Sequence, residues 1–564
     1  MEGRFGWPLI VSFFIFHYLL QMLWFILIGL SALGVSAWYT YHWDLFFNSD
    51  FAMVGLVGQR ILETGEQFIF VPKVGYQGLL IEGNLSALLF KVLGTSPQVL
   101  HLTAVIAFTV FLASYFFALR VWFDLKVACI STFLMCWSSP LFFEKVLRTQ
   151  PNYPETFALG CALFLLYKKL LHCFRPYRFG LFAFICGFGF YLYGQIAFFL
   201  GSVLLSLLGL LPVKQRWFFI RFSLLGSLAL LIPSDFFSDF SWKGVPIFMG
   251  ISLLGPLQLG WIHRKRIKLF ISQFYSLVLT FLGCFLVGYS PAIYYRITHQ
   301  SQVSSHINFV EFSEVVWRNA QTLALFFDDF MVSAGPILLS SGLCVAVLGF
   351  FIFYLTRNLF VRLCVPYNPF WILGILILVG FLFAKDAGDA ASVRYTLGWQ
   401  LVFNLVIASL LVRLAQNKLR LALIMGSLFL VFRVSAHLFL GWPVTSRRVL
   451  NTTSAWNELQ PIADYLKAQH ISAGYADYWA AYLTTFCTRK AIILEPLSFN
   501  YLPFFEKEVN SQNRIALVKS NSRLSLSPVW PNSDNTFLFR GHRYRIENTR
   551  HFPDWTVWII SKDM

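Results

Sequence analysis

The residue best placed to do chemistry is Asp50, which follows the first long apolar stretch of the chain. Asn48 or Ser49 can cap a helix predicted from Phe51 to Gly65. Asp50 would then lie in the first turn, where the helix dipole favours an ionised carboxylate. A carboxylate held in this way beside a membrane can accept a proton from an incoming hydroxyl group. An aspartate that only starts a helix would occupy the same position. The residues around Asp50 are therefore needed to distinguish a catalytic base from a helix-start residue.

Further charged residues are predicted on the same side of the membrane. Arg60 and the segment 73–78 follow in the same loop, and helices predicted at 51–64 and 79–92 would lie along the interface. Glu144, Arg148 and Glu155 surround the start of a later span. Two loops with carboxylates and several arginines could therefore converge on one outer vestibule, although ordinary interfacial anchoring also explains an arginine such as Arg148.

Most of the chain is too apolar for a water-soluble domain, since 57% of its 564 residues are hydrophobic and 13% are charged. Apolar runs recur from Trp7 to Trp442, each about as long as the roughly 20 residues that a helix needs to cross a bilayer. We predict thirteen spans, of which the short pair around Tyr193 is also compatible with one broken helix. The spans are 9–33, 98–119, 126–142, 155–171, 179–192, 194–211, 217–232, 246–261, 269–290, 333–356, 369–384, 395–413 and 419–440.

Alternate loops differ in charge, which predicts the orientation. Cytoplasmic loops retain Lys and Arg, and with a cytoplasmic N-terminus the inner loops contain a single acidic residue, Asp124. The loop 34–97 and the C-terminal tail are then extracytoplasmic. The basic residues of the inner loops include Arg120, Lys126, Lys168, Lys169, Arg175, Arg178, Lys214, Arg216, Arg264, Lys265, Arg357, Arg413, Lys418 and Arg420.

The formal charge of +17 comes largely from these inner loops and from the tail, so anionic lipid headgroups are its natural partner and nucleic acid is not. The sequence contains no P-loop, GxGxxG, HExxH or paired CxxC motif, and the spacing of its histidines indicates no metal site. The first apolar stretch is too long for a signal peptide and is expected to remain as an anchor.

The composition changes after residue 442. Residues 1–442 are predicted to form the membrane module, and residues 443–564 a small extracytoplasmic α/β domain with interspersed charges. A helix is expected at 454–468, and strands at 491–494, 515–518 and 555–560.

The chain resembles a known family at several points along its length. These are the Asp50 loop with its following helix, the segment 76–78, Glu155 at the start of a span, the segment 288–291, Arg394 with Tyr395 before a late span, and the segment 474–482 in the tail. In the order of these parts it is similar to the polytopic glycosyltransferases of the GT-C type. The family 39 branch, related to protein O-mannosyltransferases and bacterial lipid A aminoarabinose transferases, is the most similar.

The resemblance implies a reaction and roles for particular residues. Such enzymes move a sugar from a polyprenyl-phosphate carrier to an acceptor hydroxyl on the extracytoplasmic side, usually with inversion. Asp50 matches the general base, and Glu155 matches a second acidic position that helps to bind acceptor or donor. Arg394 matches the basic residue that meets the carrier phosphate. Many members have paired acids at the first position, whereas here Asp44 is six residues away, which leaves use of a divalent metal open.

A polyprenyl-phosphate donor needs particular groups in its binding site, and the predicted outer face contains them. A lipid phosphate needs an apolar groove, cationic groups and a base near the acceptor. Arginine suits phosphate because its planar fork gives charge-assisted, often bidentate contacts that stabilise a leaving group. Arg394 is the first choice, followed by Lys385, Arg60 and Arg148, and snorkelling from a helix end would equally explain Arg394.

Two other classes of protein share some of these features. A transporter or flippase of lipid-linked sugars would show internal repeats and polar residues near mid-span, and the sequence shows neither. An O-antigen type polymerase or ligase would place its main site in one large late loop. We therefore predict a polytopic α-helical membrane glycosyltransferase, with a glycolipid, polysaccharide or protein as acceptor. The bacterial inner membrane is the predicted location, with the C-terminal domain in the periplasm.

Overall fold

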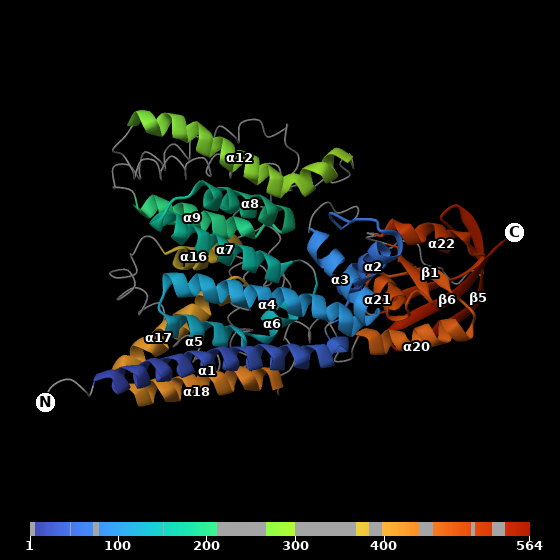
Figure 1. Cartoon of the computed structure of the whole chain (residues 1–564). Coiled ribbons are helices and arrows are strands. Elements are labelled where there is room, and N and C mark those ends of the chain that lie inside the picture. Colours follow the sequence, from blue (N-terminus) through green and yellow to red (C-terminus); the bar gives the residue numbers. More distant parts are fainter. Residues whose placement is uncertain are drawn as a thin grey trace.

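A computed structural model describes residues 6–45, 47–71, 78–149, 152–210, 267–298, 368–382, 397–438, 455–497, 502–521 and 536–563. In these ranges the chain forms a helical bundle with a sheet domain at one end (Figure 1). The bundle helices are α1 (Gly6–Tyr41), α4 (Pro97–Trp122), α5 (Leu125–Met135), α6 (Pro140–Val146), α7 (Tyr153–His172), α8 (Pro176–Leu192), α9 (Ile196–Leu210), α12 (Ile267–Thr298), α16 (Pro369–Leu382), α17 (Trp399–Asn417) and α18 (Leu419–Leu438).

Three helices of the described chain are long and apolar enough to cross a membrane: Met22–Tyr41 within α1, then α4 and α17. Shorter apolar helices or parts of helices correspond to most of the other predicted spans, and the predicted pair around Tyr193 is the two helices α8 and α9. The spans predicted at 217–232, 246–261 and 333–356 lie outside the described residues, so the number thirteen stays a prediction.

The largest differences from the predicted helix boundaries are at three places. α1 continues to Tyr41, beyond the end expected at 33 and into the segment predicted as a loop, and the other two differences lie at a proline. The span expected at 126–142 is divided, because α5 ends at Met135 and α6 begins at Pro140, whose ring cannot follow a preceding helical turn. The Ser139 hydroxyl caps the new helix by accepting the Phe142 N–H at 3.3 Å. Conversely, α12 continues through Pro291 to Thr298, beyond the end expected at 290.

Glycines allow α8 and α12 to pack closely. A Cβ atom at Gly187 would lie 2.1 Å from the carbonyl oxygen of Phe285, and one at Gly288 would lie 2.3 Å from that of Phe184. Both obstacles are backbone atoms, which cannot rotate away. Small residues at such a crossing let two membrane helices approach without the help of a hydrophobic driving force.

The C-terminal domain contains one mixed six-stranded sheet in the order β2-β1-β3-β6-β5-β4. β1 (Ala473–Ala476) pairs in parallel with β2 (Ile493–Pro496) and with β3 (Arg514–Ser520), and the remaining pairs are antiparallel. The predicted helix and three strands are confirmed as α20 (Ala455–Ala468), β2, β3 and β6 (Trp555–Lys562). Five further elements of the domain were not predicted from the sequence: β1, β4 (Thr536–Phe539), β5 (His542–His551), α21 (Tyr478–Cys487) and α22 (Glu506–Ser511).

The helices after the first span belong to the core of the sheet domain. α2 (Ser49–Thr64) and α3 (Leu80–Leu93) confirm the predicted helices 51–64 and 79–92, and they lie between the bundle and the sheet in Figure 1. Phe51, Val54 and Val57 of α2 are buried in one apolar cluster with Leu483 and Phe486 of α21. α2 is therefore a packed helix between two parts of the protein, not one that lies open along an interface. The predicted boundary at 442 and 443 lies outside the described residues.

Candidate active site at the end of the helical bundle

Asp50 occupies the first turn of α2, as the sequence predicts. The Asn48 side chain caps this helix, because its Oδ1 accepts the Phe51 N–H at 3.1 Å. The unpaired backbone N–H groups and the dipole of this terminus favour a negative charge. Asp50 is half-buried, while Ser49 and Phe51 on either side of it are buried. The backbone of Asp50 is thus held in place by its buried neighbours, while its side-chain carboxylate remains accessible to a substrate.

Two consecutive residues of α2 are bound by one residue of the sheet domain. The Tyr478 hydroxyl donates a hydrogen bond to Oδ1 of Asp50. In the opposite direction, the Ser49 hydroxyl donates to the backbone carbonyl of Tyr478 at 2.7 Å. No other hydrogen bond of the Asp50 side chain occurs within the described ranges, so Oδ2 has no partner there. One carboxylate oxygen is held and the other is available.

Asp477 in turn fixes Tyr478 on the sheet. Its carboxylate accepts the Ser520 N–H at 2.6 Å, and its own N–H donates to the Val518 carbonyl at 3.1 Å. Asp477 and Tyr478 directly follow β1, and β2 and β3 flank that strand on opposite sides. In sheets with parallel strands, ligands bind at the carboxyl end of the strand where the connections diverge in this way. Here the first turn of α2 occupies that position.

A second polar group of residues surrounds the start of α7. Asn152 has a left-handed backbone (φ 62°), is buried, and donates to the Gly78 carbonyl at 2.7 Å. The Gly78 N–H donates to the Leu192 carbonyl at 3.2 Å. The Tyr191 hydroxyl donates to the Ile69 carbonyl at 2.5 Å. The segment between α1 and α4 is therefore bound to the start of α7 and to the end of α8, which connects the Asp50 region to this second group.

Several buried polar atoms near the start of α7 have no hydrogen-bond partner within the described part of the chain. They are Arg148 Nε, Thr149 Oγ1, Asn152 Oδ1, Glu155 Oε2 and Thr156 Oγ1. Native proteins pair most such atoms, and a local concentration of unpaired ones calls for an explanation such as a bound group. Arg148 and Glu155 are 6% and 7% exposed, so both are already largely removed from solvent.

Three of the predicted site residues, Asp50, Glu155 and Arg60, lie in different parts of the structure. Asp50 is adjacent to Phe51, which belongs to the apolar cluster shared with the sheet domain, whereas Tyr153 and Phe157 beside Glu155 belong to the core of the bundle. Arg60 lies ten residues beyond Asp50, about 15 Å along α2. Its guanidinium pairs with Glu66 at 3.1 Å and lies over the ring of Phe504.

The remaining predicted site residues are Asp44, Arg394, Tyr395 and Lys385. Asp44 lies half-buried in a short 3-10 helix, Trp43–Leu45. Arg394, Tyr395 and Lys385 lie outside the described residues. Within the described residues no group of three or more His, Cys, Asp or Glu side chains could hold a metal ion.

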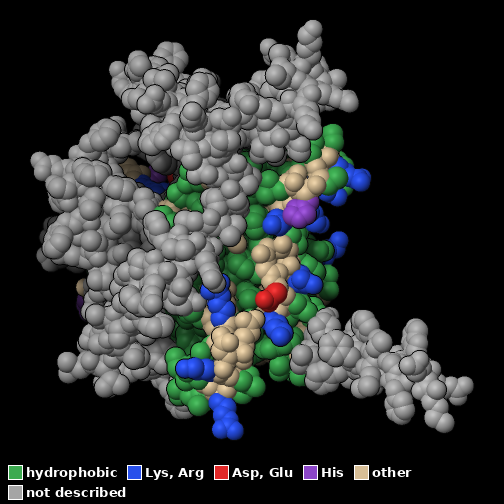
Figure 2. Space-filling model, turned by 90° about the vertical axis from the view of Figure 1, so that its left-hand side faces the viewer, with side chains coloured by type: hydrophobic (Ala, Val, Ile, Leu, Met, Phe, Trp, Pro, Cys, Tyr) green, Lys and Arg blue, Asp and Glu red, His purple; other side chains and the backbone are tan. Residues whose placement is uncertain are grey.

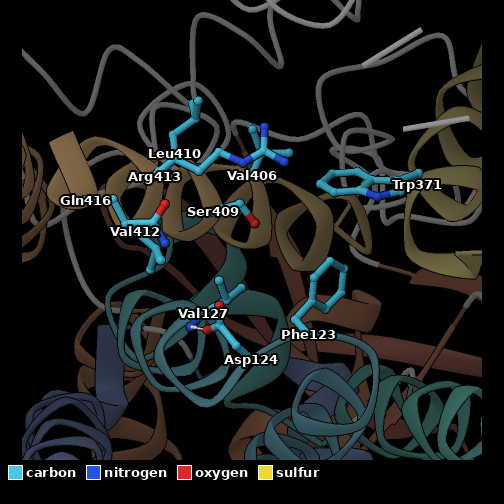
Figure 3. Close-up of a pocket in the computed structure, with 10 residues that line it drawn as sticks. All are labelled: Phe123, Asp124, Val127, Trp371, Val406, Ser409, Leu410, Val412, Arg413 and Gln416. Atoms are coloured by element: carbon cyan, nitrogen blue, oxygen red, sulfur yellow. Dashed lines mark hydrogen bonds between the residues drawn. The ribbon is translucent and has the colours of Figure 1, made fainter. Parts of the chain in front are cut away.

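The opposite end of the bundle carries described basic residues of the predicted inner loops. Figure 2 shows that end, with Lys and Arg side chains spread over it and acidic ones sparse. A cavity of about 260 Å³ lies there between the α4–α5 turn and the last turns of α17. In Figure 3 Asp124 and Val127 line one side of it, and Ser409 and Arg413 the other. α4 has 26 residues, which separates this cavity from the Asp50 region by about 39 Å. The cavity is therefore not part of the candidate site.

Comparisons with known proteins give remote likenesses only. No family model matches the chain, and no curated protein matches it. The apo oligosaccharyltransferase of Archaeoglobus fulgidus aligns at 10% identity and a TM-score of 0.43, over 88% of this chain and 69% of that one. The same archaeal enzyme, AglB, in complex with an inhibitory peptide and a dolichol-phosphate aligns at 11% identity and 0.42, with the same coverage. ArnT from Cupriavidus metallidurans aligns at 11% identity and 0.44, over 95% of this chain and 97% of that one.

The aligned structures agree in type with the GT-C resemblance predicted from the sequence, and they do not single out family 39. TM-scores below 0.5 at such identities establish neither the fold nor the activity of this chain. The assignment of a function therefore depends on the site.

Proposed function

We propose that this chain is an integral-membrane glycosyltransferase. It moves a sugar from a polyprenyl-phosphate carrier to an acceptor hydroxyl at the extracytoplasmic membrane face, with inversion at the sugar carbon. Asp50 is the general base. The observation that carries the proposal is the carboxylate of Asp50 itself, fixed on a capped helix terminus with one oxygen held by Tyr478 and the other without a partner within the described chain.

The proposed reaction uses the free oxygen of the Asp50 carboxylate. The acceptor hydroxyl gives its proton to the free oxygen of Asp50 while its own oxygen attacks the anomeric carbon, and the polyprenyl phosphate leaves. A positioned base contributes about 10²–10⁴-fold to such a step. The leaving phosphate gains negative charge, which a cation in a poorly solvated place stabilises best.

Arg148 and Glu155 are proposed to bind substrate near the start of α7. A buried arginine whose Nε has no partner among the described residues suits an anionic ligand, because the guanidinium fork makes charge-assisted bonds to phosphate oxygens. Glu155 is proposed to accept hydrogen bonds from sugar or acceptor hydroxyls. Arg394 remains the proposed partner of the carrier phosphate, with Tyr395 and Lys385 beside it.

The location is also proposed. The first outer loop and the sheet domain pack on each other at one end of the bundle, while the basic loops lie at the other end. Because basic loops stay in the cytoplasm, the candidate site would face the periplasm of a bacterial inner membrane.

The test is complementation of a deletion strain, with mass spectrometry of cell-envelope glycans and glycolipids. Wild type, Asp50→Asn and a control, Asp124→Asn, are compared at equal protein levels. Asp124 also lies at a helix start, where its Oδ1 accepts the Val127 N–H at 2.8 Å, but it lies at the opposite end of α4. We expect wild type and the control to restore the product and Asp50→Asn to lower it by about 10²-fold or more. Equal restoration by Asp50→Asn would eliminate Asp50 as the base.

A further inference from the structure

We infer that Tyr478, a residue of the C-terminal domain, is a positioning residue for the Asp50 carboxylate. The candidate base is supplied by α2 after the first span, but its orientation is set by a side chain 428 residues away along the chain. The C-terminal domain would then contribute directly to the orientation of the catalytic base. This inference rests on the proposed function of Asp50.

The contact is built from both sides. Tyr478 is 8% exposed and donates its hydroxyl to Asp50, while its backbone carbonyl accepts from Ser49, which is fully buried. Two hydrogen bonds of opposite direction between adjacent positions fix both the ring and the backbone of Tyr478. Asp477 fixes the same segment to β3 through Ser520.

A second contact keeps α21 from sliding along α2. Gly55, one and a half turns beyond Asp50, faces the ring of Phe486 so closely that a Cβ atom there would lie 2.4 Å from Cε2 of the ring. The Phe486 ring also stacks on Phe47 with centroids 5.7 Å apart. Tyr478 and Phe486 thus engage α2 at two points, which sets the register between the two helices.

The consequence for chemistry concerns rotation of the carboxylate. The terminal torsion of aspartate has broad, roughly two-fold preferences, so a free carboxylate samples many orientations. A hydrogen bond to one oxygen selects an orientation, and catalytic steps are sensitive to small misplacement of the reacting atoms. With Oδ1 bound to Tyr478, Oδ2 is the oxygen left to face the acceptor hydroxyl.

The first experiment needs no activity and uses the full-length protein in nanodiscs. Thermal unfolding is measured for wild type, Tyr478→Phe, Asp50→Ala and the double variant. Tyr482→Phe serves as the matched control, because it removes a buried hydroxyl from the same helix, one that accepts the Leu502 N–H at 2.9 Å. We expect the effects of Tyr478→Phe and Asp50→Ala to be non-additive, and those of Tyr482→Phe and Asp50→Ala to add. Additive effects of the first pair would overturn the inference.

The second experiment separates positioning from binding. Tyr478→Phe is expected to bind undecaprenyl phosphate, used as a probe, as tightly as wild type does. In complemented cells it is expected to yield about tenfold less product, a loss typical of one hydrogen bond to a charged group, and no further loss in the Asp50→Asn background. Full product from Tyr478→Phe beside an inactive Asp50→Asn would overturn the positioning role alone. A fully active Asp50→Asn would overturn the proposed base, and the positioning role with it, even where the unfolding data show coupling.

Discussion

The packing of the sheet domain against α2 can be tested at Gly55, where the sign of the effect depends on the structure. In Gly55→Ala, the added Cβ atom would lie 2.4 Å from Cε2 of Phe486 and 2.8 Å from Cδ2 of Leu100. Phe486 and Leu100 are 1% and 0% exposed, and the Phe486 ring is confined by Phe47 and Phe90. The Phe486 ring and the Leu100 side chain therefore have little room to move away from an added methyl group.

Two effects compete in this substitution. Alanine is more favourable than glycine in a helix interior by about 1 kcal/mol. An extra carbon in a filled core costs about 1–3 kcal/mol, and the upper end applies because both neighbours are confined. We expect a net loss of about 2 kcal/mol in the free energy of unfolding, which corresponds to a fall of about 4–8 °C in Tm for a unit of 150–250 residues.

The assay is thermal unfolding of full-length protein in nanodiscs, followed by tryptophan fluorescence. Gly34→Ala is the control, because Gly34 lies inside α1 and an added Cβ atom would have no described atom within 4 Å apart from its own helix backbone, so the Tm of this variant should be unchanged or slightly higher. Adding Phe486→Leu to Gly55→Ala should make room for the methyl group and give a smaller loss than the sum of the two single losses. Equal melting temperatures for wild type and Gly55→Ala would refute the packing of α21 on α2.

Two further predictions concern the bundle. Gly288→Ala on α12 should lower the Tm and the yield of folded protein, since its Cβ would meet the Phe184 backbone at 2.3 Å, whereas Gly283→Ala on the same helix meets no atom within 4 Å and should not; equal behaviour of the two would contradict the close α8–α12 crossing. Cys173 is exposed at the predicted cytoplasmic end, so a membrane-impermeant maleimide should label it in inverted vesicles and not in intact cells, with Cys173→Ser to identify the band. Labelling from outside would reverse the predicted orientation.

Local signals in the sequence were sufficient for the elements around Asp50. Asn48 before an aspartate and an apolar run predicts a capped helix, and the structure has that cap. Long apolar runs and the late α/β composition likewise predict the bundle helices and part of the sheet. These features depend on residues close together in the chain, where pattern and structure are directly linked.

The contacts that complete the candidate site are of another kind. Tyr478 reaches Asp50 across 428 residues, and no periodicity in the sequence encodes such a pairing. β1 has only four residues, two of them alanine, and β5 is mostly exposed and has four charged residues among its ten, so neither has the alternation that identifies a half-buried strand. The segment 474–482 did carry a usable signal: an Asp-Tyr pair directly after a short apolar run, at the point where a parallel strand gives way to a helix.

The cluster that joins α2 and α3 to the sheet domain also has a consequence for biosynthesis. Its early part ends at Leu100 and its late part begins at Leu459. At about 5–20 residues per second, the roughly 360 residues between them take the ribosome about 20–70 s to synthesise. In the proposed orientation, the apolar faces of α2 and α3 are outside the translocation channel during that time, without the strands that later cover them. Nascent chains stalled before residue 459 should therefore expose a chaperone-binding surface around Phe51 and Val54, and release of the finished C-terminus should remove it.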